Sequence, residues 1–234
     1  AAELERDGEP REGLALVEPL MRRHGLALPA GSWKKTGTLL GHAAWLVVAG
    51  KRAAAPRRQA NQAPSEAVAL QSDLAWAVGK SLVFVDPLVG IGVLFTSLRT
   101  ARGDARRFAR AAGPLAAFVL GNVPGLKGTA RRWVEAMDAL DDEPYFKGVS
   151  HLWRALKALG TSELGVALTA AVEAMDRLQT DPRASWERVQ AASYAARALI
   201  NRGHYHSALA LIEAHAIDAD LRGDLGAVLP KIVL

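Results

Sequence analysis

The amino-acid sequence predicts an all-α protein built from repeated helix-turn-helix units. Half of the 234 residues are hydrophobic but only 6% are aromatic, so Ala, Leu and Val make up most of the apolar content. Ala and Leu are among the best helix formers. Apolar residues also recur at three- and four-residue spacing, which is the spacing of a helix. Short motifs recur further along the chain at a regular interval, as in proteins built of stacked helical pairs.

The first part of the chain, residues 1–63, is expected to contain two helices that are divergent from the rest. Apolar residues between positions 11 and 24 have helical spacing, and a glycine and a proline follow them. A second helix is expected over residues 32–54. Residues 56–64 show no periodicity and are assigned as a linker. We therefore predict a separate helical array over residues 64–234.

The array is expected to begin with two helices that meet at a proline. Ser65 can cap the start of the first helix, and Asp86 and Pro87 should end it and begin the next. Residues 81–98 are apolar enough to suggest a membrane span, but a charge inside a span is costly in lipid. We therefore expect two buried helices here and no membrane span.

An internal similarity is the strongest signal in the sequence. The motif VEAMD at residues 134–138 recurs at residues 172–176, and a shorter echo, IEA, follows at residues 212–214 after a similar interval. In the last copy, apolar residues of one predicted helix end at Gly203. The residues from Tyr205 onward then form the apolar face of a second helix.

This last unit, residues 192–214, resembles the tetratricopeptide repeat, in which small residues let paired helices cross closely and a glycine lies in the turn. The resemblance implies an α-solenoid, whose stacked repeats form a continuous surface for protein partners. The alternative architecture is a single helical bundle without true repeats. In such a bundle, residues 1–30 would contact residues 190–234.

Longer stretches are similar to a helical region of large bacterial serine/threonine kinases, in which a kinase domain and an AAA-type ATPase domain precede tetratricopeptide-like helices. The resemblance covers roughly residues 10–228 and implies a cytoplasmic regulatory tail that senses a partner. It does not imply kinase activity here, because the sequence has no His-Arg-Asp, Asp-Phe-Gly or Walker motif. The stretches concerned are residues 73–79, 85–87, 98–104, 186–187 and 220–225.

The net charge of +5 is unevenly distributed. Residues 1–132 contain 19 basic and 10 acidic side chains, whereas residues 133–234 contain 10 basic and 14 acidic ones. Such a basic half can attract nucleic acid or an acidic protein surface, although a solvated arginine-rich surface is the simpler interpretation. The chain has no cysteine, which excludes disulfides and fits a reducing cytoplasm. Because it begins at Ala1 with helix-like residues, we expect a piece of a longer polypeptide.

Five residues are assigned as possible partner-binding residues: Arg106, Arg107, Arg110, Trp133 and Tyr194. The arginines lie in the basic segment, and aromatic side chains often anchor protein interfaces. We favour a protein partner, or an upstream kinase or ATPase domain, over nucleic acid. The three arginines share a helix face only in part, and aromatic residues for base stacking are sparse nearby.

No residue pattern indicates chemistry in this chain. His204 and His206 are two residues apart on a helix and therefore point to different faces, which makes them a poor metal pair. The acidic run from Asp138 to Glu143 is better explained by helix capping than by acid-base catalysis. We predict no catalytic residue, no metal and no cofactor. The six tryptophans are expected mainly in the core: Trp33, Trp45, Trp76, Trp133, Trp153 and Trp186.

Overall fold

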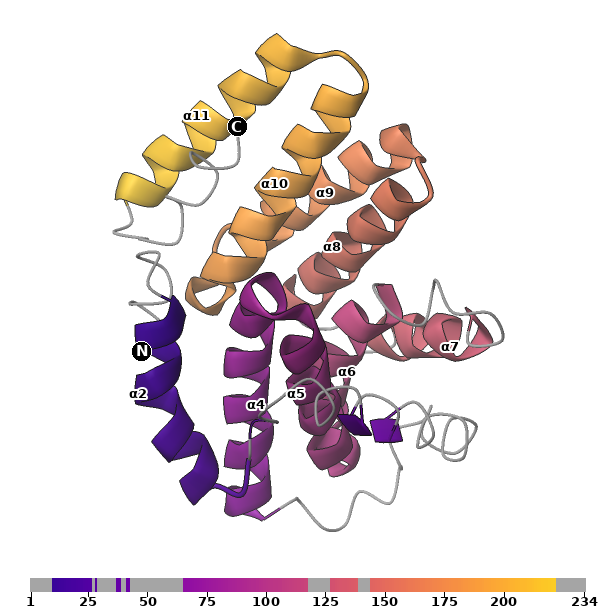
Figure 1. Ribbon diagram of the computed structural model, residues 1–234. Helices are drawn as coiled ribbons and strands as arrows, with labels where there is room; N and C mark the ends of the chain where they lie inside the picture. The colour runs from indigo at the N-terminus through magenta and orange to yellow at the C-terminus, as the bar shows by residue number, and fades with distance from the viewer. Residues whose placement is uncertain are drawn as a thin grey trace. The chain divides into compact units, whose positions relative to one another are not determined.

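The computed structural model describes residues 10–26, 28, 37, 38, 41, 42, 65–117, 127–138 and 144–221. Within these residues there are nine α-helices, two 3-10 helices and no strand, which confirms the predicted all-α class (Figure 1). None of the helices described is long and apolar enough to cross a membrane. Packing divides the chain into two compact units, which we call unit 1 and unit 2.

Unit 1 contains the first helices and most of α7. The helix predicted over residues 11–24 is present as α2, and its apolar side packs against α4 and α5 in one buried cluster. That cluster is formed by Val17, Met21, Leu26, Ala75, Val78, Leu82, Val89 and Val93. The elements of unit 1 are α2 (Pro10–Arg23), α4 (Glu66–Val85), α5 (Pro87–Thr100), η1 (Ala101–Gly103), α6 (Ala105–Leu115) and α7 (Lys127–Asp138).

The boundaries of α4 and α5 follow from local capping. The Ser65 hydroxyl accepts a hydrogen bond from the backbone N–H of Val68 at 3.4 Å, so α4 begins where the sequence predicted. Asp86 ends α4, and its carboxylate accepts the backbone N–H of Val89 at 3.2 Å to start α5. Pro87 occupies the first turn of α5, where its missing N–H has no cost.

The helices α4 and α5 cross at very short range. Ser72 and Ser97 are fully buried and bond reciprocally, each hydroxyl donating to the other residue's carbonyl, at 3.1 and 2.9 Å. Nearer the turn, a Cβ atom added to Gly90 would lie 2.6 Å from the backbone Cα atom of Val83. The hairpin therefore brings backbone against backbone, and position 90 has no room for a side chain.

Unit 2 consists of two helical hairpins in succession, α8–α9 and α10–α11 (Figure 1). Helix α10 lies against both helices of the preceding hairpin, and α11 lies against α10. Small residues make the first of these contacts, since Ala158, Ala167 and Ala198 form one buried cluster between three helices. The elements are α8 (Pro144–Gly160), α9 (Leu164–Leu178), η3 (Pro182–Ala184), α10 (Ser185–Asn201) and α11 (Tyr205–Leu221).

The two hairpins turn in the same way. Ser162 and Gly203 both have left-handed backbone conformations, with φ of 60° and 81°. The N–H of the next residue then reaches back to the preceding helix, from Glu163 to the Ala158 carbonyl at 2.8 Å and from His204 to the Leu199 carbonyl at 2.9 Å. Both are Schellman-type helix ends. The predicted helix end at Gly203 is confirmed.

These turns correct the interval of the repeat in unit 2. The interval from Ser162 to Gly203, which we call the turn interval, is one residue longer than the interval between the VEA and IEA motifs. Burial follows the turn interval. Val172 is 40% exposed but its counterpart in the motif, Ile212, is 7% exposed. A shift of one residue is a rotation of about 100° around a helix. Matching the VEA and IEA motifs therefore pairs an exposed face of α9 with a buried face of α11. The first copy of the motif lies in α7.

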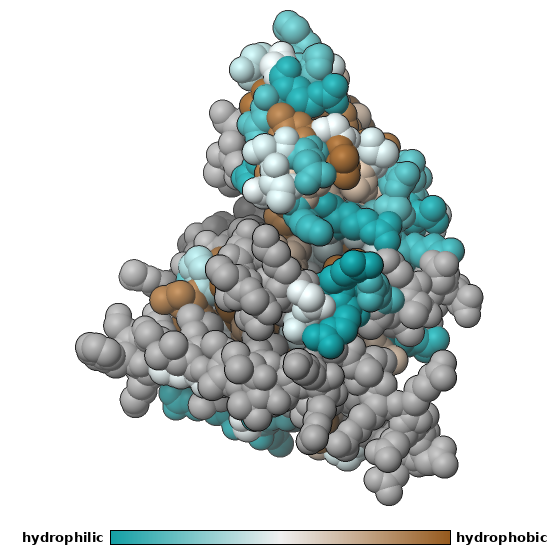
Figure 2. All heavy atoms as spheres, turned by 90° about the vertical axis from the view of Figure 1, so that its right-hand side faces the viewer, coloured by the Kyte–Doolittle hydropathy of each residue, from teal (hydrophilic) through white to brown (hydrophobic). Residues whose placement is uncertain are grey.

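The described surface has exposed hydrophobic residues on helices of both units. On the face shown in Figure 2, brown hydrophobic residues form small patches among hydrophilic ones. The large side chains concerned are Leu20, Leu70 and Leu88 in unit 1, and Val166, Val172, Tyr205, Leu209 and Ile217 in unit 2.

Some predictions concern residues that are not described. The linker over residues 56–64, most of the predicted helix over residues 32–54, and Trp33 and Trp45 lie outside the described ranges. The division into residues 1–63 and 64–234 stays a prediction, as does the solenoid arrangement of the array.

Candidate functional site

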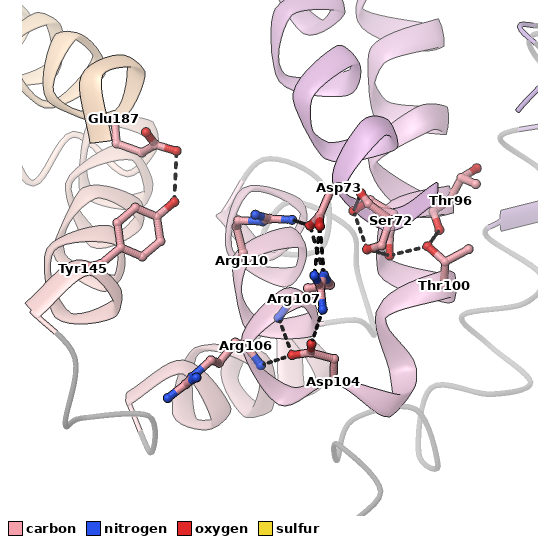
Figure 3. Close-up of polar contacts among 11 residues, drawn as sticks. Ser72, Asp73, Thr96, Thr100, Asp104, Arg106, Arg107, Arg110, Tyr145 and Glu187 are labelled. Atoms are coloured by element: carbon pink, nitrogen blue, oxygen red, sulfur yellow. Dashed lines mark hydrogen bonds and ion pairs between the residues drawn. The ribbon is translucent and has the colours of Figure 1, made fainter. Parts of the chain in front are cut away.

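Three of the predicted partner-binding residues lie on α6 of unit 1. The helix begins at Asp104, whose carboxylate accepts the backbone N–H groups of Arg106 and Arg107 at 2.9 and 3.0 Å. This cap fixes where each side chain of the first turn points. Arg107 and Arg110, one turn apart, face α4, whereas the Arg106 side chain is exposed (Figure 3).

Both inward arginines bind the same carboxylate, Asp73 of α4. Arg107 donates from Nε and Nη2 to the two Asp73 oxygens at 2.9 to 3.1 Å, and Arg110 donates from Nη2 at 2.5 Å. Arg107 also donates from Nη1 to Asp104 at 2.6 Å, so its guanidinium bridges two carboxylates (Figure 3). We call these four residues the Asp73 cluster. It connects α4 to the start of α6, two helices that are separated in the sequence by all of α5.

The electrostatics of the Asp73 cluster are balanced. Burial alone would raise the pKa of Asp73, but the hydrogen bonds and positive charges of Arg107 and Arg110 outweigh it and hold the pKa below its ordinary value. The hydrogen bond to Asp73 raises the pKa of Arg107, partly offset by burial, and the bond to Asp104 adds to the rise. Two carboxylates face two guanidinium groups, so the cluster has no excess positive charge for an external anion.

An aromatic side chain extends the same cluster along α4. The Arg110 guanidinium carbon lies 5.4 Å from the centroid of the Trp76 ring, and the Lys80 ammonium nitrogen lies 5.7 Å from it. Both distances are in the range of cation–π attraction. Trp76 itself is buried. Arg110 therefore contacts a carboxylate and a ring of α4, which explains why most of its side chain is withdrawn from solvent.

Other arginines of the basic segment also bond within the chain. Arg131 pairs with Glu135 on the exposed side of α7 at 2.8 Å. Arg132 donates to the Gly128 carbonyl of its own helix at 3.1 Å. Four arginines of the basic segment thus donate hydrogen bonds within the chain. Only the exposed ones could exchange these bonds for a phosphate at little cost in free energy, because exposed ion pairs are weak.

The two aromatic candidates lie in the cores of different units. Trp133 of α7 is fully buried and makes an edge-to-face contact with Phe108 of α6, with ring centroids 6.0 Å apart. Tyr194 of α10 is buried in unit 2, and desolvation raises the pKa of its hydroxyl. The three candidate arginines all belong to α6 of unit 1, whereas Tyr194 belongs to α10 of unit 2. Partner binding by all five residues stays a prediction, but Trp133 and Tyr194 are closed to solvent in this conformation.

Sequence reasoning missed the buried polar residues of unit 2. Glu187 is fully buried on α10 and accepts a hydrogen bond from the Tyr145 hydroxyl of α8 at 3.2 Å (Figure 3). Its neighbour Arg188 donates to the carbonyls of Leu178, Gln179 and Asp181, which caps the C-terminal end of α9. A Glu-Arg pair amid apolar residues was the available signal. It does not reveal which turn the arginine caps.

A second polar contact joins the helices of the first hairpin. His151 Nδ1 of α8 lies 2.7 Å from a Glu173 oxygen of α9. His204 and His206, considered as a metal pair, are both exposed at the start of α11. Among the residues described, no group of three or more His, Asp or Glu side chains is arranged to hold a metal ion.

Unit 2 also presents apolar side chains to solvent. Tyr205 and Leu209 are 66% and 50% exposed, and their four-residue spacing places them on one face of α11. Val166 and Val172 are exposed on α9, and Ile217 is exposed further along α11. Exposed apolar residues of this size are candidates for contact with another protein when they share a face.

Comparison with known proteins yields no relative. No protein-family profile, no curated protein and no solved structure matches this chain.

Proposed function

We propose that this chain is a non-catalytic helical-repeat scaffold that binds a protein partner or a neighbouring domain. The observation that supports this most is the succession of two hairpins in unit 2. They share a turn geometry, and the first helix of the second hairpin packs on both helices of the first. Repeat arrays of this type leave extended surfaces on which peptides and domains are bound.

We further propose that the parent setting is a bacterial serine/threonine kinase and ATPase signalling protein. The support is the resemblance of residues 73–79 and 98–104 to the helical region of such proteins. In unit 1 these two stretches supply Asp73 and Asp104, the two carboxylates of the Asp73 cluster. The resemblance therefore concerns residues that join α4 to α6, which suits a regulatory region more than a reacting site.

Nucleic-acid binding on the basic half is the alternative. It requires several cations on one surface that are free to contact phosphates. Arg107, Arg110, Arg131 and Arg132 already donate within unit 1, and two of them are held by Asp73. Releasing the pair on Asp73 would leave a partly buried carboxylate without its partners, which is unfavourable. The geometry therefore favours the protein partner.

The test compares the two classes of ligand on the same purified 234-residue chain. A displayed library of helical peptides is selected against the chain, and recovered peptides are measured by isothermal titration calorimetry. Mixed-sequence DNA and RNA are titrated at two salt concentrations. We expect peptides with micromolar affinity that changes little with salt, and nucleic-acid binding that is weak at both concentrations.

Exposed arginines give the matched control. An Arg131→Ala/Arg132→Ala variant, which changes two exposed arginines outside the five predicted partner-binding residues, should leave peptide affinity unchanged. Tight nucleic-acid binding that weakens steeply with salt, with a smaller salt slope in this variant, would overturn the proposal, since each lost phosphate contact lowers the slope by about 1. Failure to recover any peptide ligand would also contradict it.

A further inference from the structure

The contact between the two hairpins of unit 2 shows how one repeat receives the next. Ala198 of α10 packs between Ala158 of α8 and Ala167 of α9, and Leu168 of α9 packs against the same cluster. The face of α10 that takes part in the core of unit 2 is rich in small side chains, which allow close helix approach. Its buried alanines are Ala191, Ala192, Ala195, Ala196 and Ala198.

The turn interval identifies the residues of the second hairpin that correspond to those of this contact. By that interval, Ala167 corresponds to Ala208, which is also buried and packs with Ala196 of α10, the other helix of its own hairpin. Leu168 corresponds to Leu209, and Leu164 corresponds to Tyr205 on the same face. The two α9 residues are partly buried, whereas Leu209 and Tyr205 are half or more exposed.

The exposure of these two residues thus has a specific cause. Leu209 corresponds to Leu168 of α9. Leu168 packs against a cluster that includes Ala198 of the following helix, α10, whereas Leu209 is half exposed. No described helix covers it. Val166 provides a contrast on α9, since it is 55% exposed although α10 is present, and its counterpart is the polar Ser207. The exposed apolar face of α11 therefore corresponds in position to the α9 face that packs inside unit 2.

We infer that the α11 face formed by Tyr205 and Leu209 is a docking surface for an amphipathic α-helix of the partner, whose contact face is rich in alanine like that of α10. This inference rests on the proposed scaffold function and adds where the partner binds and what chemistry it presents. Burial of Leu209 would contribute apolar free energy to binding, and small residues on the partner helix would let the two helices pack closely.

The chain has no cysteine, so a single introduced cysteine gives a unique attachment site. The Leu209→Cys variant of the 234-residue chain is labelled with a benzophenone photo-crosslinker and mixed with a peptide that copies residues 185–201. Val166→Cys is the matched control, because it is equally exposed but outside the transferred interface. We expect saturable crosslinking at position 209 that is at least about tenfold stronger than at position 166.

A second pair of variants measures affinity without a label. Leu209→Glu should weaken peptide binding about tenfold in a fluorescence anisotropy titration, whereas Val166→Glu should leave it unchanged. Far-UV circular dichroism verifies that both variants keep their helix content.

Three outcomes would overturn the inference. Equal crosslinking at both positions would show non-specific contact. Crosslinked dimers formed without peptide, and lost in Leu209→Glu, would assign the face to a second copy of the chain. Crosslinks from position 209 to the chain's own residues 222–234, with the peptide excluded, would show that the chain covers this face itself. If library peptides still bind elsewhere in any of these cases, the scaffold proposal stands and only the docking surface is wrong.

Discussion

The hairpin α4–α5 in unit 1 and the hairpins of unit 2 hold their helices together in different ways. In unit 1, the crossing uses a glycine without room for a side chain, and two buried serines bond to each other's carbonyls. In unit 2, alanines and leucines fill the crossings, and the same left-handed turn closes both hairpins.

The two units therefore depend on different kinds of contact. Unit 1 depends on contacts that occur once, such as Gly90 against Val83 and the arginines on Asp73. Unit 2 also has single contacts, such as Gly148 against Leu178, but one local rule is used at both of its turns. Substitutions at close contacts that occur once should therefore have larger effects that are specific to position, and substitutions at the two turns of unit 2 should have smaller effects that are similar in both hairpins.

The largest effect is expected for Gly90→Ala in unit 1. The new methyl group would lie 2.6 Å from Cα of Val83 and 2.7 Å from the carbonyl carbon of Leu82, and backbone atoms cannot move aside as a flexible side chain can. We expect a loss of about 3 kcal/mol in the free energy of unfolding. Hydrogen exchange measured by mass spectrometry should show faster exchange in α4 and α5.

Gly165→Ala on α9 is the matched control for Gly90→Ala. No atom lies within 4 Å of the added methyl group there, so the substitution should stabilise α9 by a few tenths to about 1 kcal/mol through helix propensity alone. If Gly90→Ala were as neutral as Gly165→Ala, the close crossing in unit 1 would be wrong.

A smaller effect is expected for Gly148→Ala in unit 2, where the added methyl group meets a side chain. Its Cβ would lie 2.5 Å from Cγ of the buried Leu178. We expect a loss of about 2 kcal/mol from overpacking. In the background of Leu178→Ala the clash is absent, so the same methyl group should cost nothing or stabilise slightly. Urea denaturation of the four proteins of this double-mutant cycle measures the coupling, and a coupling below about 0.5 kcal/mol would contradict the contact.

The third effect concerns the Asp73 cluster. Asp73→Asn keeps the shape of the side chain but leaves two arginines without their carboxylate, and we expect a loss of about 1 to 2 kcal/mol at pH 7 because the cluster is only partly buried. The pKa of Asp73 lies below its ordinary 3.8 in the folded chain, so its stabilisation is present above that value and is lost as the pH falls through the lowered pKa.

The stability difference between the wild type and Asp73→Asn should therefore shrink toward zero in acid. Chemical denaturation at several pH values between 7 and 3 measures it, with the exposed Asp176→Asn on α9 as control. A difference that is constant with pH would show that the carboxylate charge does not stabilise the fold.

Much of the helical framework could be predicted because its signals are local. Ser65, the Asp86-Pro87 pair and Gly203 act on the backbone of their immediate neighbours, and each was placed correctly as a helix start or end. The repeat interval was one residue short, because matching letters at Val172 and Ile212 does not record which face of a helix each occupies.

The candidate site could be predicted only in part. Arg107 and Arg110 were singled out as basic residues, but their acceptor Asp73 lies on another helix, and no spacing in the sequence connects them. Trp133 was assigned as a possible partner-binding residue, although the tryptophans were expected mainly in the core. Its contact with Phe108 depends on how α6 and α7 pack, which is decided by tertiary structure.

The smallest effects are expected at the two turns of unit 2, where the repeated rule can be tested directly. No atom lies within 4 Å of a methyl group added at Gly203, so Gly203→Ala should cost only the left-handed backbone strain of about 1 kcal/mol. Ser162 already bears that strain at φ 60°, so Ser162→Gly should recover a similar amount, reduced by the added freedom of glycine in the unfolded chain.

Because the two turns use the same hydrogen bonds at separate positions, the two changes should be independent of each other. The double variant Ser162→Gly/Gly203→Ala should then unfold with nearly the wild-type free energy, and hydrogen exchange should slow in α9 while it quickens in α11. A double variant that loses as much as Gly203→Ala alone would show that the serine turn is not equivalent to the glycine turn. In that case the turn interval would describe where the chain turns but not what stabilises each hairpin.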